Sequence, residues 1–178
     1  MRSSVMTDTS NCPQPLATFV RPMLGLNAWG VKQGHGSFLT FEFGQPKSEI
    51  GGYRSGSRKS AHVRGQWHLW IYCCDWKVRQ DGMQLASSEH DEKAIGRATA
   101  ALNGRKLMCV SVLPESGRSS FTFDLGGSLE TWPYGDDATQ EQWMIYNELE
   151  VFTFNAMGDY SCGPPTKPSD LQSWKPLR

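Results

Sequence analysis

The sequence predicts an α+β domain: a mostly antiparallel, twisted sheet or partly open β-barrel from two related halves, with one helix packed on it. The run at residues 37–44 returns in similar form at residues 119–126. Each copy is followed, after a loop, by a Gln-Trp pair that enters an apolar strand. Twinned strand segments of this kind indicate internal repetition in a β fold. We therefore predict a pseudo-repeat over about residues 34–78 and 117–154.

Length and composition narrow the class of protein. The chain has 178 residues, enough for one domain that buries roughly 70% of the surface its unfolded chain exposes. The 18 basic and 18 acidic residues balance, so no global field draws the chain to nucleic acid or to an anionic membrane. The 5 cysteines are irregularly spaced, and the polar N-terminus lacks the apolar core of a signal peptide. We expect a cytoplasmic protein with reduced thiols, no membrane contact and no cofactor.

The predicted domain has a tail at each end. Residues 1–15 are rich in Ser, Thr, Asn and Pro and are expected to be disordered. Residues 16–162 form the single domain, and residues 163–178 form a Pro-rich, extended tail. The domain starts with a short helix or an extended arm, because Pro22 forbids an uninterrupted helix over residues 16–26.

The two copies of the repeat differ most in the segments that follow them. Residues 45–66 are rich in Gly and Ser and are predicted to form a mobile loop. Against Glu49, this loop carries the basic residues Lys47, Arg54, Arg58, Lys59 and Arg64. The corresponding segment, residues 127–141, is acidic through Glu130, Asp136, Asp137 and Glu141. These segments are either ordinary solvated loops or a partner-specific surface.

The middle of the chain predicts a long strand and then the helix. Residues 67–78 are apolar on both faces, which is typical of a central strand. Ser87 or Ser88 is expected to cap a helix that ends at Asn103 and Gly104. Ile95, Ala98 and Leu102 give that helix an apolar stripe. Further strands are expected at residues 106–113, 129–132, 143–146 and 148–154, around the second twin strand.

The sequence contains few patterns typical of a metal site or a catalytic site. Histidines and cysteines gather between His62 and His90, yet their spacing matches no zinc module, so we predict no metal site. The chain also lacks a nucleophile elbow and a phosphate-binding loop. The first alternative function rests on Asp75-Trp76-Lys77 with Glu49 upstream, which loosely resembles the acidic and lysine residues of restriction-type nucleases. That resemblance implies a metal-dependent nuclease using Glu49, Asp75 and Lys77.

A second alternative is single-stranded nucleic-acid binding. Aromatic residues lie near the basic segment, and bases stack on aromatic side chains beside basic grooves. The residues concerned are Trp67, Trp70, Tyr72 and Trp76. They are equally compatible with a place in the core.

Residues 24–31, 34–44 and 67–71, together with Trp76, resemble small uncharacterised intracellular bacterial β-rich proteins of the toxin-immunity type. The resemblance implies a non-catalytic protein-binding module that neutralises or regulates a partner protein. Complementary charge speeds such association. The candidate partner-binding residues are Glu130, Asp136, Asp137 and Glu141, with Arg54, Arg58 and Lys59. A homodimeric structural or interaction module, formed through an exposed sheet edge, is a further alternative.

Overall fold

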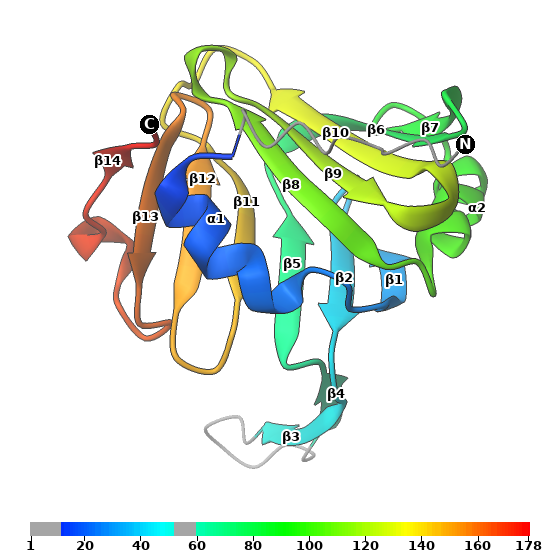
Figure 1. The fold of residues 1–178 in the computed structure, drawn as a ribbon, viewed down its shortest axis with the longest axis horizontal. Coiled ribbons are helices and arrows are strands. Elements are labelled where there is room, and N and C mark those ends of the chain that lie inside the picture. Colours follow the sequence, from blue (N-terminus) through cyan, green and yellow to red (C-terminus); the bar gives the residue numbers. More distant parts are fainter. Residues whose placement is uncertain (1–11, 52–59) are drawn as a thin grey trace, which may run out of the picture.

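The computed structural model describes residues 12–51 and 60–178. Their strands form a seven-stranded sheet, a five-stranded sheet and a separate two-stranded hairpin, and every pairing is antiparallel (Figure 1). The two large sheets pack face to face as an open sandwich that shares one hydrophobic core. The α+β class and the mostly antiparallel sheet are confirmed. Within the described residues, no helix has the length and apolar character needed to cross a bilayer.

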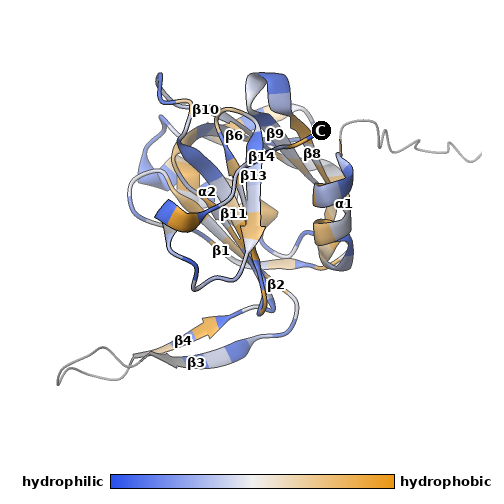
Figure 2. Cartoon of the chain, turned by 90° about the vertical axis from the view of Figure 1, so that its left-hand side faces the viewer, coloured by the Kyte–Doolittle hydropathy of each residue, from blue (hydrophilic) through white to orange (hydrophobic). Residues whose placement is uncertain are grey.

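The order of strands in each sheet differs from their order in the chain. The seven-stranded sheet runs β1 (Ala28–Gln33), β2 (Leu39–Phe43), β5 (Trp67–Ile71), β11 (Glu141–Tyr146), β12 (Val151–Asn155), β13 (Asp159–Gly163) and β14 (Lys175–Pro176). The five-stranded sheet runs β7 (Met83–Ser87), β6 (Cys74–Gln80), β10 (Gly127–Pro133), β9 (Arg118–Phe123) and β8 (Leu107–Leu113). The hairpin pairs β3 (Lys47–Gly51) with β4 (Ser60–Arg64) and extends away from the sandwich (Figure 2).

Aromatic side chains hold the two sheets together. Trp143 is fully buried on β11, and its ring lies edge-on to Phe121 of β9 at a centroid distance of 5.4 Å. Its Nε1–H donates a hydrogen bond of 2.8 Å to Ser119 Oγ in the opposite sheet. Stacking on Phe154 at 5.2 Å fixes the other side of the indole. Such buried aromatic contacts contribute more than their area alone, so Trp143 is a principal link between the sheets.

Helix α2 (Glu92–Leu102) confirms the predicted helix, but its cap is different. Asp91 is the N-cap, and its carboxylate accepts a 2.7 Å hydrogen bond from the Ala94 N–H. The prediction of Ser87 or Ser88 as the cap is wrong: Ser87 belongs to β7, and the Ser88 hydroxyl donates a hydrogen bond to Asp75. The stripe of Ile95, Ala98 and Leu102 is buried, as predicted, and the helix packs against β1 and β7.

The predicted long strand at residues 67–78 is wrong, because the chain changes sheets inside it. β5 ends at Ile71 and β6 begins at Cys74 in the other sheet. At this corner the Tyr72 N–H donates to Gln142 O at 2.8 Å. Odd-numbered residues such as Leu69 face the core before the corner, and even-numbered residues such as Trp76 face it afterwards. Because of this change of parity, residues 67–78 look apolar on both faces when they are taken as one continuous strand.

The sequence repeat does not become two equivalent halves. β2 and β5 are neighbours in the seven-stranded sheet, whereas β9 lies in the five-stranded sheet and β11 pairs with β5. Phe41 of β2 and Phe123 of β9 instead face each other across the sandwich, with ring centroids 5.9 Å apart. The two runs look alike because both supply the inner face of a sheet.

The predicted loop and tails are more ordered than expected where the structure describes them. Within residues 45–66, the described part is the β3–β4 hairpin rather than a mobile loop. The predicted disorder of residues 1–11 lies outside the described residues, but α1 (Gln14–Val20) already begins inside the predicted tail. A 3-10 turn (Arg21–Met23) with Pro22 then ends it, so the first segment is a helix. At the C-terminus β14 pairs with β13 and Leu177 is fully buried, so that tail is docked.

Candidate functional site

A groove on the outer face of the seven-stranded sheet is the main candidate site. Because Leu39, Phe41 and Phe43 of β2 face the core, Thr40 and Glu42 point outward. The register of β2 with β5 sets Trp70 opposite Thr40 and His68 opposite Glu42. Residues of strand β4 of the hairpin line one side, and the volume of the groove is about 560 Å³. We call this site the outer groove; its main polar and aromatic residues are Lys32, His35, Phe38, Thr40, Glu42, His62, Arg64, His68, Trp70 and Tyr72.

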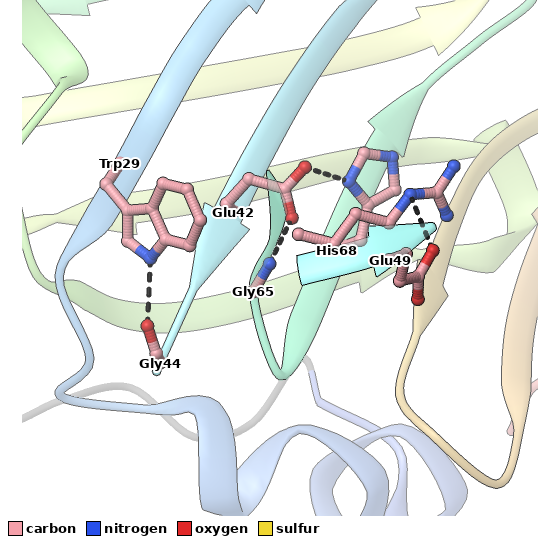
Figure 3. Close-up of polar contacts among 7 residues, drawn as sticks. Trp29, Glu42, Gly44, Glu49, Gly65 and His68 are labelled. Atoms are coloured by element: carbon pink, nitrogen blue, oxygen red, sulfur yellow. Dashed lines mark hydrogen bonds and ion pairs between the residues drawn. The ribbon is translucent and has the colours of Figure 1, made fainter. Parts of the chain in front are cut away.

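A carboxylate–histidine pair forms the floor of the outer groove (Figure 3). Glu42 is only 8% exposed, and its Oε1 lies 2.7 Å from His68 Nδ1. Its Oε2 accepts a 2.9 Å hydrogen bond from the Gly65 N–H. A neutral imidazole that donates from Nδ1 keeps Nε2 as an acceptor. The pair therefore fixes the orientation of the His68 ring.

Gly65 is needed for this arrangement because the chain passes very close to β2 there. A Cβ at position 65 would lie 2.4 Å from the Phe43 carbonyl oxygen and 2.8 Å from the Phe43 nitrogen. Backbone atoms cannot move aside as a flexible side chain can. Glycine thus lets the N–H at the β4–β5 junction reach Glu42. Beside it, the Trp29 Nε1–H donates to Gly44 O at 2.9 Å and fixes the end of β2 (Figure 3).

Three aromatic rings form one wall of the outer groove. The centroids of Phe38 and Trp70 each lie 4.7 Å from that of Tyr72, and Phe38 and Trp70 are 6.2 Å apart. All three side chains are half-buried. We call them the aromatic wall. Their mutual contacts fix the rings before any ligand arrives, which lowers the entropic cost of binding.

The four aromatic residues considered for single-stranded nucleic acid do not share one surface. Trp70 and Tyr72 belong to the aromatic wall, but Trp67 packs on Phe19 of α1 at a centroid distance of 5.6 Å. Trp76 is fully buried, and its Nε1–H donates to Ser37 O at 2.6 Å. Core packing therefore explains part of the predicted cluster.

Acidic partners compensate the described charges of the hairpin. Lys47 pairs with Glu148, and Arg64 Nε lies 3.7 Å from Glu49 Oε2. All four side chains are well exposed, so these pairs add little stability. They do make the described hairpin less basic than its sequence indicates. Arg54, Arg58 and Lys59 lie outside the described residues.

The outer face of the five-stranded sheet is a second candidate surface. Glu130 of β10 lies 3.0 Å from Lys77 Nζ and 3.5 Å from Arg79 Nε on β6. The ring of Trp132 has Lys77 at 5.5 Å and Arg118 at 5.6 Å from its centroid. Small residues lie around this cluster at paired positions, namely Ser111, Ser120, Thr122 and Ser128. We call these residues together the Trp132 face.

The four acidic residues predicted to bind a partner occupy different settings. Glu130 is compensated within the Trp132 face. Asp136 and Asp137 are exposed after β10; hydrogen bonds from the Thr139 hydroxyl and N–H lower the pKa of Asp137. Glu141 belongs to the other sheet, and partial burial raises its pKa.

The residues of the nuclease alternative are not brought together. Asp75 and Lys77 share the outer side of β6, where Asp75 accepts from Ser88 Oγ at 2.8 Å and Lys77 pairs with Glu130. Glu49 lies on the hairpin beside Arg64, at the opposite end of the molecule (Figure 1). Within residues 12–51 and 60–178, no cluster of three or more His, Cys, Asp or Glu side chains has the geometry to hold a metal ion.

Sequence reasoning missed Thr40, Glu42 and His68 as a unit. A signal was present in β2, where Thr40 and Glu42 alternate with apolar residues, and in β5, where His68 interrupts an apolar run. Which polar residues meet depends on a strand register that spans 26 positions, from Glu42 to His68. Local pattern alone does not fix that register.

Comparison of the chain with protein-family models, with curated proteins and with solved structures finds no match.

Proposed function

We propose that the chain is a non-catalytic protein-binding module whose partner docks on the Trp132 face. The observation that carries this proposal is the position of Trp132, which is half-buried and lies between Lys77 and Arg118 on the outer face of the five-stranded sheet. Tryptophan and arginine are the residue types most enriched at the energetic centres of protein interfaces. A partner that covers Trp132 would also exclude water from its cation–π contacts and strengthen them.

The shape and charge of the face support the same proposal. Serine and threonine side chains keep the surface beside Glu130 and Ser128 low, which suits a broad protein partner better than a small molecule. Glu130 between Lys77 and Arg79 gives a mixed charge pattern that selects a complementary partner. The exposed Asp136 and Asp137 follow Trp132 closely in the chain and extend this pattern at one end.

Resemblance to immunity-type proteins supports the idea that the partner is a toxin or another protein to be held inactive. In that case the sandwich is a scaffold, and the charged residues of the Trp132 face set the specificity for the partner. Asp75 and Lys77, the strongest candidates for catalysis, are engaged by Ser88 and Glu130. Their side chains therefore contribute to the surface pattern.

The test is a comparison of three immobilised baits in extracts of the native cell: the unmodified chain, Trp132→Ala and Trp174→Ala. Trp174 is the matched control, because it is also half-buried but lies beside β14 in the other sheet. Loss of a central anchor costs about 2 kcal/mol or more, roughly thirty-fold in affinity. We expect a partner that the Trp132→Ala bait loses and the Trp174→Ala bait keeps. Equal retention by all three baits would remove the Trp132 face as the interface, and recovery of the chain alone would favour a homodimer.

A further inference from the structure

The outer groove lies in the other sheet from the Trp132 face, and its chemistry indicates a different kind of ligand. Its volume of about 560 Å³ is in the range of small-molecule sites, roughly 300–1,000 Å³. Aromatic groups form one wall, and polar side chains from β2 and β5 form the floor. Such a site fits a ligand that has apolar faces and many hydrogen-bonding groups.

The charges of the groove argue against a strongly anionic ligand. Phosphate groups need several uncompensated cations. Here Arg64 lies beside Glu49, and the floor itself holds the carboxylate of Glu42. Lys32 is exposed at the rim. A carboxylate at the floor repels a phosphate but accepts hydrogen bonds from neutral hydroxyl groups.

One polar atom at the floor has its hydrogen-bonding capacity unused. Thr40 Oγ1 is buried and has no hydrogen-bond partner within the described chain. A buried hydroxyl without a partner costs about 1–3 kcal/mol. It lies on β2 between the aromatic wall and the Glu42–His68 pair, opposite Trp70. A ligand hydroxyl in the groove would give Thr40 Oγ1 the partner that it lacks, and His68 lines the same groove.

We propose that the outer groove binds a neutral carbohydrate. The C–H groups of a sugar ring carry partial positive charge and are attracted to the negative face of an aromatic ring. Trp70 and Tyr72 line the groove as parts of the aromatic wall. The hydroxyl groups of the sugar both donate and accept, which matches a floor made of a hydroxyl, a carboxylate and an imidazole. This site is independent of the partner proposed for the Trp132 face.

The test is isothermal titration calorimetry of the whole chain with cellohexaose, maltohexaose, mannohexaose and chitohexaose. Each sugar is used at up to about 10 mM, which saturates even a site with a Kd of roughly 1 mM. Trp70→Ala and Thr40→Val are the test variants, and Trp174→Ala is the control from the far edge of the sheet. All three side chains are partly exposed, and urea unfolding checks that each variant is folded. Single-stranded dT20 is titrated in parallel at low and high salt.

We expect at least one hexasaccharide to bind with little dependence on salt. Trp70→Ala then weakens that binding about tenfold or more, Thr40→Val weakens it less, and Trp174→Ala leaves it unchanged. Three results would overturn the proposal: no binding of any hexasaccharide, sugar binding that is unchanged in Trp70→Ala, or salt-dependent binding of dT20 in place of the sugars. The last result would instead support a single-stranded nucleic-acid groove.

Discussion

Replacement of Glu42 by alanine is the most direct test of the hydrogen bonds at the floor of the outer groove. The carboxylate is 8% exposed and serves both His68, at 2.7 Å, and the Gly65 N–H, at 2.9 Å. Each buried group left without its hydrogen-bond partner costs about 1–3 kcal/mol, and the loss of Glu42 leaves two such groups, for a total of about 3–5 kcal/mol. We expect Glu42→Ala to lower the free energy of unfolding by that amount. Glu42→Gln keeps an acceptor for Gly65 and is expected to cost about 1–2 kcal/mol.

A double-mutant cycle separates the pair from simple loss of packing. The single variants Glu42→Ala and His68→Ala each leave the other side chain of the pair without its partner, whereas the double variant removes both side chains. The Gly65 N–H loses its acceptor in both variants that lack Glu42, so its loss cancels in the cycle. We therefore expect a coupling energy of about 1.5–3 kcal/mol from urea unfolding followed by tryptophan fluorescence. Thr122→Ala, exposed on the opposite sheet, is the control and should change stability by no more than about 0.5 kcal/mol. Additive losses, within about 0.5 kcal/mol, would show that the two side chains do not form the pair.

Three further predictions concern other parts of the fold. Partial burial raises the pKa of Glu141. The folded chain therefore holds the proton of this carboxyl more tightly than the unfolded chain does. As a result, the free energy of unfolding falls as the pH rises from the unfolded pKa of Glu141 to its folded pKa. Glu141→Gln should therefore raise the urea midpoint at pH 7, with no gain near pH 3, about one unit below the ordinary glutamate pKa; an equal gain at both pH values would contradict this. Burial raises the pKa of Cys74 far above its usual range, so iodoacetamide followed by peptide mass mapping should label the exposed Cys162 in the native chain and Cys74 only after unfolding. Gly65→Ala should shift NMR signals at the β4–β5 junction and lower stability, because its Cβ would meet the Phe43 backbone at 2.4 Å; a wild-type spectrum and urea midpoint would show that the close approach is absent.

The sequence predicted the fold class and the helix because their signals are local. The apolar stripe of α2 and its stop at Asn103 lie within a few turns of chain, and both are found in the structure. The sequence does not determine which residue is the N-cap of α2, because Ser88, Asp91 and their neighbours all have side chains suited to that position. The choice was settled by a contact outside the helix, since Asp75 engages the Ser88 hydroxyl.

The candidate sites depend on contacts between distant segments, which no local pattern contains. The chain changes sheets at Tyr72, and the core-facing positions shift from odd-numbered to even-numbered residues there. A pattern that assumes one continuous strand therefore places Trp76 on the wrong face. The likeness of residues 37–44 to residues 119–126 came from a shared environment, as the facing pair Phe41 and Phe123 shows. The Trp132 face likewise needs β6, β9 and β10 side by side before its cations meet the indole.

We expect a protein partner to cover the Trp132 face in the cell. Site-specific photo-crosslinking in the native cell tests it most directly, with the photoreactive amino acid placed at Thr122 or, in a separate variant, at Leu149. Both side chains are exposed, but Thr122 lies on the Trp132 face and Leu149 lies between β11 and β12 of the other sheet. We expect a discrete crosslinked product from position 122 that disappears when Trp132 is changed to alanine, and no such product from position 149. A product from position 149 with none from position 122 would contradict it.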